Sequence, residues 1–407
     1  MSKKTIVEIP TYDEKNNVRP MAEAVLECGV DGLFEDHLRC RGRIVQDGAA
    51  AEKELRGMSA YAIIMAGGNG ERFWPMSTLE RPKQFVTLFG GKPLIRHAAD
   101  RLKGLIPPER TLVITAERLV AQTRRALPGI PRANVIGEPC RRDTAAAVAC
   151  ACGLVKRLGG PDAVGCILTA DQLMEPAAKF RRTLKSAITV ASRTDAIVTV
   201  GIEPDHPATG FGYIECGPRI NTGTPTEFHA VRRFVEKPDE KTAKRYQKSG
   251  RFCWNSGMFI WKASTMEDAF VRYAPDIAGL IGQVSKAKSI RATLKKAYPP
   301  LRAISVDYAV MEKARKVVVA RSEFKWDDVG SWTAIPKHFP VDATGNTCLG
   351  KTALLDTDDS IVISEDGRLT AVLGMKDVVV VQTPSATLVC AKDRVQDIKK
   401  LVQYVGA

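Results

Sequence analysis

The stretch Ala62–Ser77, AIIMAGGNGERFWPMS, decides the fold class of this 407-residue chain. A run of aliphatic residues typical of a buried strand leads directly into three glycines, with Arg72 and Pro75 close behind. Because glycine has no side chain, the backbone N–H groups of such a turn can approach phosphate oxygens closely. The stretch therefore predicts a strand that ends in a phosphate-binding loop.

Two common phosphate-binding motifs do not fit this loop. In the dinucleotide pattern GxGxxG read from Gly68, the third glycine position holds Phe73. The Walker pattern ends in Gly-Lys-Ser/Thr, whereas the nearby Gly91-Lys92 is followed by proline. What remains is G-G-x-G-x-R-x-x-P, followed by Arg81–Phe85, RPKQF. A tight turn with solvated charges would explain the glycines alone, but not an arginine and a lysine beside them.

The residue types of this loop suit nucleotidyl transfer. A nucleoside triphosphate attacked at its α-phosphorus develops negative charge on the α-phosphate and on the departing pyrophosphate. Rigid backbone donors, one guanidinium and one ammonium beside those oxygens would stabilise this charge. Arg72 and Lys83 are the candidate catalytic cations.

Composition gives weaker constraints. The chain is 44% hydrophobic and 26% charged, and its net charge of +14 favours anionic ligands without identifying one. No nucleic-acid motif accompanies the basic residues, and no apolar run approaches the ~18 residues that a membrane helix needs. The ten cysteines form no CxxC pair, which indicates reduced thiols and no zinc site. We therefore expect a cytoplasmic protein with no nucleic-acid or membrane partner.

From Ala60 onward, short aliphatic runs alternate with amphipathic stretches. The expected strands are Ala62–Met65, Leu112–Thr115, Val164–Leu168 and Ile197–Val200. The expected helices are Leu94–Leu105, Thr144–Leu158 and Ala177–Ser192. This alternation predicts an α/β fold with a mostly parallel sheet covered on both faces.

After about Lys337 the pattern changes to short β runs separated by turns. These runs are Ser360–Ser364, Leu369–Leu373, Val378–Gln382 and Thr387–Cys390. Arg394–Val405 then repeats apolar residues at helical spacing. Residues 337–407 are thus expected to form a small β-rich domain closed by a helix, serving packing or dimerisation.

Residues 1–57 fit neither part. Thr5–Leu26 resembles the opening of the glycosyltransferase family that includes dolichyl-phosphate mannose synthases, and the resemblance then stops. Such a fragment is too short to work as a domain, so residues 1–57 are interpreted as a non-functional extension. A chain that begins at Met58 is expected to keep full activity.

Six motifs occur together and in order from about Ala60 to near the C-terminus: AGGNGERFWPMS, RPKQF, RFVEKPD, WNSGMFIW, SVDYAVMEK and WDDVGSW. In combination they resemble the mannose-1-phosphate guanylyltransferases, also called GDP-mannose pyrophosphorylases. The resemblance implies a Rossmann-like, glycosyltransferase-A-like nucleotidyltransferase domain over residues 58–336. It also implies that residues 337–407 form a left-handed β-helix-like segment.

The resemblance assigns two groups of binding residues. The nucleotide-binding group is Ala66, Gly67, Gly68, Gly70, Glu138, Arg142, Asp143, Thr144 and Asp171. The sugar-phosphate-binding group is Gly210, Glu236, Lys237 and Asn255. Taken alone, Asp143 or Thr144 would cap the helix that follows, and Glu236 and Lys237 would be a solvated surface pair.

Asp171 and Asp328 are the metal ligands that the resemblance implies, holding Mg²⁺ as cofactor. Asp171 ends a buried strand, where ligands of open α/β sheets bind, and Mg²⁺ takes one or two carboxylates together with phosphate oxygens. Alone, either aspartate would be interpreted as a cap or turn residue. The family commonly has histidine after the first aspartate, whereas this chain has Gln172, which affects nucleotide contacts more than the metal.

For several further residues, the sequence fits a role in the hydrophobic core or a helix cap as well as a role in the binding site. Asp307 is expected to be the N-cap of a helix that Asp307 and Tyr308 open, with a contact to the sugar also compatible. The aromatic residues near the motifs fit either the core or a sugar platform, with the core favoured for most. They are Phe211, Phe259, Trp326 and Trp332.

The expected reaction makes GDP-mannose and pyrophosphate from GTP and mannose 1-phosphate. One alternative is a related enzyme for another sugar 1-phosphate or another base. A second is a non-catalytic sugar-nucleotide sensor. The presence of all five charged candidate residues at the site argues against this alternative. Because the chain stops directly after the closing helix, no isomerase activity is expected, and family analogy allows a homodimer.

Overall fold

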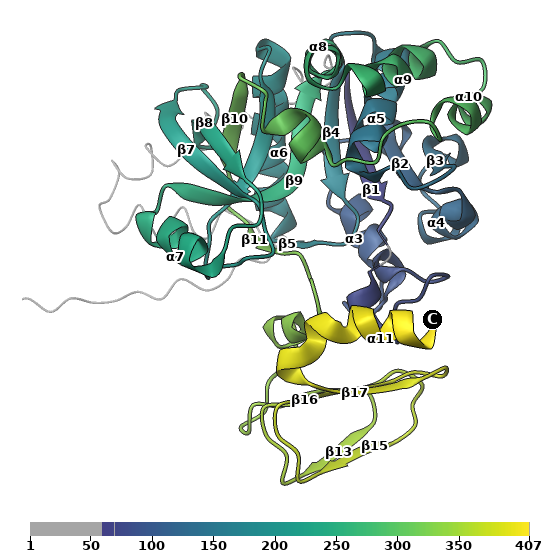
Figure 1. Ribbon diagram of the computed structural model, residues 1–407, viewed down its shortest axis with the longest axis vertical. Helices are drawn as coiled ribbons and strands as arrows, with labels where there is room; N and C mark the ends of the chain where they lie inside the picture. Colours follow the sequence, from purple (N-terminus) through teal and green to yellow (C-terminus); the bar gives the residue numbers. More distant parts are fainter. Residues whose placement is uncertain (1–58, 69, 407) are drawn as a thin grey trace, which may run out of the picture. The chain divides into compact units, whose positions relative to one another are not determined.

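The computed structural model describes residues 59–68 and 70–406, and element labels follow Figure 1. The expectations for residues 1–57 lie outside the described residues. Within these ranges no helix has the length and apolarity needed to span a bilayer.

A nine-stranded sheet forms the centre of the larger part, in the order β3-β2-β1-β4-β9-β6-β10-β8-β7. Its strands are β1 (Ala60–Ala66), β2 (Thr111–Ala116), β3 (Val135–Glu138), β4 (Val164–Thr169), β6 (Ile197–Ile202), β7 (Tyr213–Ile220), β8 (Phe228–Val235), β9 (Phe252–Lys262) and β10 (Val317–Arg321). The four strands expected in this region are confirmed, each slightly longer than its aliphatic run.

Most of these strands point the same way. β1 pairs in parallel with β2 and β4, and β2 pairs in parallel with β3. β9 runs antiparallel to both β4 and β6, so β4 and β6 share one direction, which β10 continues. Within this sheet, β8 and β9 are the strands that run the opposite way. The expected α/β class with a mostly parallel sheet is confirmed.

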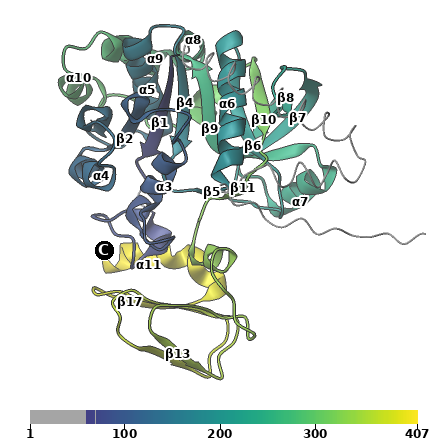
Figure 2. The same cartoon turned by 180° about the vertical axis from the view of Figure 1, so that it is seen from behind.

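Helices cover both faces of the sheet, as the opposite views of Figures 1 and 2 show. They are α3 (Leu94–Asp100), α4 (Val120–Ala126), α5 (Asp143–Gly159), α6 (Ala177–Arg193), α7 (Glu240–Ser249), α8 (Ala263–Tyr273), α9 (Pro275–Ser285) and α10 (Ile290–Ala297). α5 is built from small buried residues, and a Cβ on its Gly153 would lie 2.7 Å from Cβ of Val284. That close approach packs α5 against α9 in the main core.

One expected helix is shorter than predicted. α3 starts at Leu94 as expected but ends at Asp100 rather than Leu105. Gly104 then adopts a left-handed φ of 81°, and two prolines follow at Pro107 and Pro108. Proline cannot continue a helix, so the chain turns here toward β2.

The C-terminal strands form a coil of parallel strands, which the last of them joins in the antiparallel direction. They are β12 (Thr347–Leu349), β13 (Thr352–Leu355), β14 (Ile361–Ser364), β15 (Thr370–Leu373), β16 (Val378–Gln382) and β17 (Thr387–Ala391). β12, β14 and β16 stack in parallel, as do β13 and β15. The turn from Thr347 to its partner Ile361 takes fourteen residues, and the turn from Ile361 to Val379 takes eighteen, as does that from Thr352 to Thr370. The expected β-rich domain is confirmed, and its closing helix, α11 (Ile398–Val405), follows a helical turn rather than starting at Arg394.

The coil shares a hydrophobic core with the loop region of the larger part. Phe73 and Met76 after the glycines, Trp332, and the coil residues Ile361 and Val379 belong to one cluster of buried side chains. α11 contributes Ile398 and Val402 to the same cluster. The glycine loop is therefore supported by the C-terminal domain.

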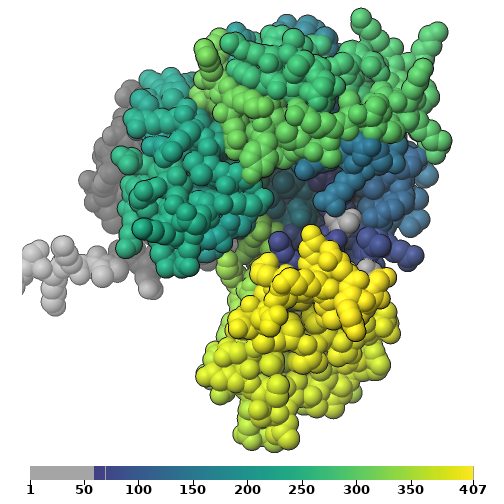
Figure 3. All heavy atoms as spheres, in the orientation of Figure 1, coloured from purple at the N-terminus to yellow at the C-terminus, as the bar shows by residue number. Residues whose placement is uncertain are grey.

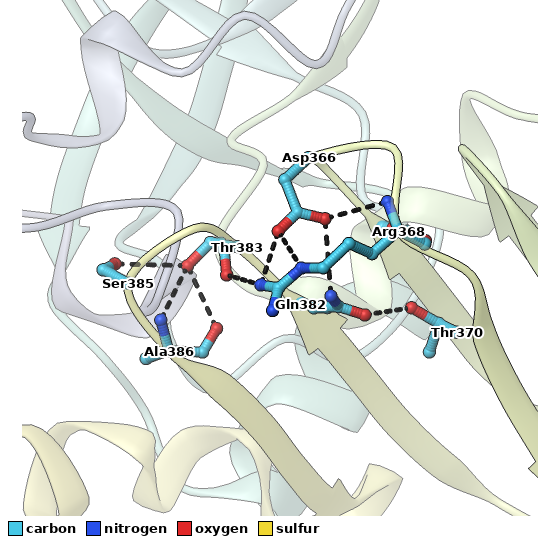
Figure 4. A network of polar contacts seen from close by, with 8 residues as sticks. Asp366, Arg368, Thr370, Gln382, Thr383, Ser385 and Ala386 are labelled. Atoms are coloured by element: carbon cyan, nitrogen blue, oxygen red, sulfur yellow. Dashed lines mark hydrogen bonds and ion pairs between the residues drawn. The ribbon is translucent and has the colours of Figure 1, made fainter.

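A polar contact accompanies this shared core. Arg81, in the RPKQF motif, donates through Nη1 to Oε1 of Glu365 at 2.7 Å. Glu365 leads into the turn drawn in Figure 4, where Arg368 is bonded to both Asp366 and the Thr383 carbonyl. The network fixes the turn that presents Glu365 to the loop region.

Candidate active site

The glycine loop follows the carboxyl end of β1. Gly70 has a left-handed φ of 63°, and a Cβ there would lie 2.1 Å from Cβ of Lys83. At Gly67 a Cβ would lie 3.2 Å from Oε2 of Glu138, whereas at Gly68 nothing lies within 4 Å. The protein itself thus requires glycine at position 70, and the open space at Gly68 leaves room for a ligand.

Two buried side chains hold the start of this loop. The Ala66 carbonyl accepts hydrogen bonds from Gln84 Nε2 at 2.9 Å and from Thr115 Oγ1 at 3.0 Å. Gln84 is buried and lies inside the RPKQF motif, but sequence reasoning gave it no role. The sequence shows only that this amide lies between Lys83 and Phe85, and its burial and its bond to Ala66 are known from the structure alone.

Lys83 connects the loop to two distant aspartates. Its side chain is 9% exposed, and Nζ donates to Oδ2 of Asp171 at 2.9 Å and to the Asp328 carbonyl at 2.6 Å. The short strands β5 (Leu173–Glu175) and β11 (Lys325–Asp327) pair antiparallel and bring the two aspartate segments together. The structure therefore gathers three of the predicted residues at one point.

The Asp328 carboxylate carries an unfavourable charge. Burial raises its pKa, and the nearby charges of Asp327 and Asp171 raise it further, against the opposing charge of Lys83. Among the described residues, no hydrogen-bond donor contacts this carboxylate. A half-buried carboxylate beside a second one suits a divalent cation, which would relieve the repulsion. Asp171 and Asp328 therefore fit a site for a divalent cation to which phosphate oxygens and water would add ligands.

Arg72 lies in the helical turn Glu71–Phe73, directly after the glycines. Its side chain is exposed, and the described part of the chain offers it no ion pair or hydrogen bond. The next residue, Phe73, is buried and anchors the turn in the shared core. Arg72 is thus a cation on a fixed turn that is available to a ligand.

The surface is hollowed beside this loop. Figure 3 shows a recess between the teal atoms, the light green atoms and the purple-to-blue atoms of the described chain. The purple segment that contains the glycine loop lies at its edge.

The other predicted nucleotide contacts lie around the ends of β3 and α5. Burial raises the pKa of Glu138, whose carboxylate accepts a hydrogen bond from the Tyr298 hydroxyl. Arg142 instead donates to the Pro299 carbonyl at 2.9 Å, and no hydrogen bond among the described residues joins it to the glycine loop. In this conformation the Arg142 guanidinium therefore binds the backbone at Pro299, and its binding to a nucleotide stays a prediction.

The capping expected at α5 is not observed. The helix begins at Asp143 itself and has no side-chain cap, and the Asp143 carboxylate accepts the N–H of the adjacent Thr144 at 2.8 Å. The Thr144 hydroxyl, however, accepts from the Val306 N–H at 2.8 Å, and Ala145 N–H donates to the Ile304 carbonyl at 3.1 Å. The entry to α5 is thus tied to the segment that leads to Asp307.

Asp171 is supported from behind by a buried arginine that sequence reasoning missed. Arg101 is 6% exposed and donates through Nη1 to the Gln172 carbonyl at 2.9 Å. Burial lowers the pKa of Arg101 to about 10, and the charge of Asp171 opposes this effect. A buried guanidinium therefore lies close to the carboxylate that would bind metal.

The predicted sugar-phosphate residues gather at a second point. Glu236 follows β8, and its Oε1 accepts from Lys237 Nζ at 2.9 Å. A Cβ on Gly212 would lie 2.5 Å from Glu236 Oε2, so the loop from the exposed Gly210 to Gly212 runs directly over that carboxylate. Asn255 N–H on β9 donates to the Gly212 carbonyl at 2.8 Å. Three of the four expected residues, Glu236, Lys237 and Asn255, thus lie together around Gly212, two residues after the expected Gly210.

The N-cap prediction for Asp307 is wrong. The helical turn Asp307–Met311 begins after Val306, and Ser305 Oγ accepts the Tyr308 N–H at 3.3 Å. The Asp307 carboxylate faces the sugar group instead, where Asn255 Nδ2 donates to its Oδ1 at 2.8 Å. The cap was expected because an aspartate precedes a helical stretch of sequence. The actual partner, Asn255, lies far away in the sequence and cannot be recognised from that local pattern.

Asp307→Asn is expected to remove a pH dependence of stability between about pH 4 and pH 6. Burial raises the pKa of Asp307 from 3.8 to about 6, and the charge of Glu236 adds to the effect. The folded chain therefore holds this proton more tightly than the unfolded chain does. The resulting stabilisation is complete below about pH 4 and is lost as the pH rises through about 6.

Urea unfolding at a series of pH values measures this difference. Asparagine keeps the acceptor for Asn255 but cannot ionise, so the variant should have the flatter profile. Asp268→Asn on α8, an exposed position, is the matched control. Parallel profiles for Asp307→Asn and the parent chain would contradict the assignment.

Gln172 links the two groups of residues. Its Oε1 accepts from Trp326 Nε1 at 2.9 Å, and its Nε2 donates to the Ser256 carbonyl at 3.2 Å, next to Asn255. Trp326 and Phe211, with ring centroids 5.2 Å apart, are half-buried at this junction, whereas Phe259 and Trp332 are core residues. The glutamine that departs from the family pattern therefore has a structural role between the predicted metal ligands and the predicted sugar-phosphate residues.

This fold and this arrangement define a nucleotide-handling transferase. A family model described as nucleotidyl transferase matches residues 61–344. A second model, described as a MannoseP isomerase/GMP-like beta-helix domain, matches residues 350–404. Because the first match covers more than half of the sequence, the chain belongs to the nucleotidyl transferase family.

Similar proteins narrow the group further. The chain is 38% identical, over 84% of its length, to Mannose-1-phosphate guanylyltransferase 2 of Escherichia coli O157:H7, and the match covers 73% of that protein. It is 37% identical, over 85% of its length, to Mannose-1-phosphate guanylyltransferase of Escherichia coli K12, again over 73% of that protein. A crystal structure described as mannose-1-phosphate geranyltransferase from Thermus thermophilus matches with a TM-score of 0.78 and 34% identity, over 86% of this chain and 100% of that one. The resemblance drawn from the six motifs is confirmed.

Proposed function

We propose that this chain transfers a guanylyl group from GTP to mannose 1-phosphate, releasing pyrophosphate and GDP-mannose. The observation that carries the proposal is Lys83, which joins the glycine loop to Asp171 and to the Asp328 segment. The names of the similar proteins support the same reaction.

The nucleotide end would act through fixed positive groups. The triphosphate would lie along the glycine loop, where backbone N–H groups and the open space at Gly68 accommodate it. Arg72 would bind the phosphates from the exposed turn, and Lys83 would stabilise the charge that develops on the α-phosphate. Glu138 and the entry to α5 would contact the nucleoside.

A divalent cation, which we propose to be Mg²⁺, would be held by Asp171 and Asp328 and would supply charge neutralisation on the phosphates. Lys83 donates to the same two segments, so the metal and the ammonium would share one site. Arg101 keeps the Asp171 segment in place.

The sugar end would position the nucleophile. Lys237 would hold the phosphate of mannose 1-phosphate, while Glu236, Asn255 and the loop at Gly210 would bind sugar hydroxyls. A phosphate monoester is already anionic at neutral pH, so its oxygen can attack the α-phosphorus in line without a general base. Positioning and charge stabilisation would supply the catalysis.

Asp328→Asn is expected to lower activity while leaving stability equal or higher. Burial and the neighbouring carboxylates penalise the charge of Asp328 in the folded chain, so a neutral side chain of the same shape relieves that cost. The same change removes one charged metal ligand, and the Mg²⁺ concentration for half-maximal activity should rise by about 10-fold or more.

Urea unfolding without metal and a magnesium titration of turnover give the two readouts. Asp162→Asn, at an exposed position before β4, is the matched control and should leave both unchanged. An unchanged magnesium requirement in Asp328→Asn would refute its assignment as a ligand.

The reaction is tested by following pyrophosphate release with Mg²⁺, crossing GTP or ATP with mannose 1-phosphate or glucose 1-phosphate. Release only with GTP and mannose 1-phosphate is the expected result. Release with another pair would favour a related enzyme with different specificity. GTP binding without release in any mixture would favour a sensor. A chain that starts at Met58, assayed in parallel, tests the expectation for residues 1–57.

We further propose that the enzyme acts in the cytoplasm, where GTP is abundant, and that nucleic acid is not a partner. A homodimer stays a prediction from family analogy, and sedimentation of the purified chain tests it.

A further inference from the structure

Two cysteine thiols lie side by side on neighbouring strands of the large sheet. Sγ of Cys216 on β7 is 3.6 Å from Sγ of Cys253 on β9. β7 and β9 pair antiparallel with Ile214 opposite Cys253, so Cys216 lies two residues further along on the same face. No disulfide joins the cysteines that the structure describes.

The two thiols differ in environment. Cys253 is 1% exposed, whereas Cys216 is half-buried. The hydrogen bond with Cys253 lowers the pKa of Cys216 to about 7, against the opposing effect of burial, and the charges of His229 and Arg321 lower it further. Thiolate is the form that reacts with oxidants and disulfides. Cys216 is therefore suited to react first, and Cys253 lies in place to resolve the product.

The other described cysteines lack this combination. Burial raises the pKa of Cys150, Cys152 and Cys166, each of which is fully buried. Cys348 is exposed, and no thiol partner accompanies it among the described residues. The pair on β7 and β9 is distinguished by the short sulfur–sulfur distance.

We propose that Cys216 and Cys253 form a redox site that takes a peroxide or a small-molecule disulfide and closes to an intramolecular disulfide bond. With hydrogen peroxide, the Cys216 thiolate attacks one oxygen and releases hydroxide, giving a sulfenic acid. The Cys253 thiol then attacks that sulfur and water leaves. The two thiols lose two electrons and two protons, and the peroxide is reduced to two waters.

Closure would act on the sugar end of the site. A disulfide bond is about 2.05 Å long, so the sulfurs must approach by about 1.5 Å. Cys253 is packed tightly, since a Cβ on Gly201 would lie 2.7 Å from its Cβ. We therefore expect Cys216 to supply most of the approach and to draw β7 and the loop before it with it.

This movement reaches the predicted substrate contacts. Asn255 lies two residues after Cys253 and donates its N–H to the Gly212 carbonyl at 2.8 Å, next to the start of β7. Oxidation should therefore displace the Gly212 loop relative to Asn255. Assuming the proposed function, the KM for mannose 1-phosphate should rise by about 10-fold, because small misplacements of positioning groups are costly.

The covalent step is tested on the full chain without reference to activity. The protein is treated with hydrogen peroxide or oxidised glutathione, free thiols are alkylated, and the peptides are identified by mass spectrometry. A crosslink between Cys216 and Cys253, reversed by dithiothreitol, is expected. It should be lost in Cys216→Ser and Cys253→Ala and retained in Cys390→Ser. A stable sulfinic acid or glutathione adduct on Cys216 without the crosslink would overturn the proposal, as would no reaction.

The kinetic step is tested separately. The parent chain should show the rise in KM on oxidation and recover on reduction, whereas Cys216→Ser should be insensitive to both treatments. A crosslink without any kinetic change would overturn the link to the sugar end. If the reduced chain has no transferase activity at all, the proposed function fails while the crosslinking result stands by itself.

Discussion

Arg72→Ala is expected to lower turnover by roughly 10²–10³-fold while leaving the free energy of unfolding unchanged. Removal of one preorganised donor from developing charge costs about this much in enzymes where it has been measured. Arg72 is exposed on a turn whose position depends on Phe73, and the described residues provide it with no partner. Its loss therefore removes ligand contacts without removing any that hold the fold.

Steady-state kinetics and urea unfolding of the same preparation check both halves of this prediction. Arg125→Ala, an exposed arginine on α4, is the matched control and should behave as the parent chain. Arg72→Lys should recover part of the loss, because an ammonium restores the charge but not the forked geometry. Near-normal turnover of Arg72→Ala would show that Arg72 is not a catalytic residue.

Trp332→Ala is expected to destabilise the chain by about 3–5 kcal/mol and to lower turnover as well. Trp332 is fully buried, its ring centroid lies 4.8 Å from that of Phe73, and its Nε1 donates to the Trp74 carbonyl at 3.1 Å. The side chain thus joins the segment after Asp328 to the turn that carries Arg72. A cavity at this position would loosen both the segment that contains Asp328 and the turn that carries Arg72.

Trp332→Phe separates packing from the hydrogen bond. This variant keeps an aromatic ring in the shared core but loses the hydrogen bond to the Trp74 carbonyl. Loss of that bond is expected to lower the free energy of unfolding by about 1 kcal/mol, and the smaller ring adds a packing loss smaller than that of Trp332→Ala. Chemical denaturation gives the stability change, and turnover is measured at a temperature where both variants are folded. A destabilisation below about 1 kcal/mol in Trp332→Ala would mean that the loop is not supported in this way.

Much of the fold could be predicted because its local patterns are strong. Strands buried on both faces contain continuous aliphatic runs, and the helix α5 shows its buried character in its alanines. The end of α3 was harder to predict, since apolar residues continue at helical spacing past Asp100 while Gly104 and two prolines turn the chain.

The candidate site likewise contains features that the sequence predicted and features that it did not. The glycine loop was predictable, because the need for glycine at position 70 is imposed by backbone conformation and by the neighbouring Lys83. The roles of Gln84 and Arg101 were missed, since each acts through a backbone carbonyl brought near by the fold. Local spacing has no signal for such a partner.

The sequence by itself determined the α/β class, the glycine-rich turn after the first strand and, through six motifs, the family. Only the tertiary structure decided that Lys83 contacts Asp171 and Asp328, which lie 88 and 245 residues further along the chain. It also decided that Asp307 faces Asn255 rather than capping a helix, and that Cys216 lies against Cys253. The physical reason is that backbone conformation and hydrophobic periodicity are local properties. The partner of a charged or nucleophilic side chain, in contrast, is set by strand pairing between distant segments.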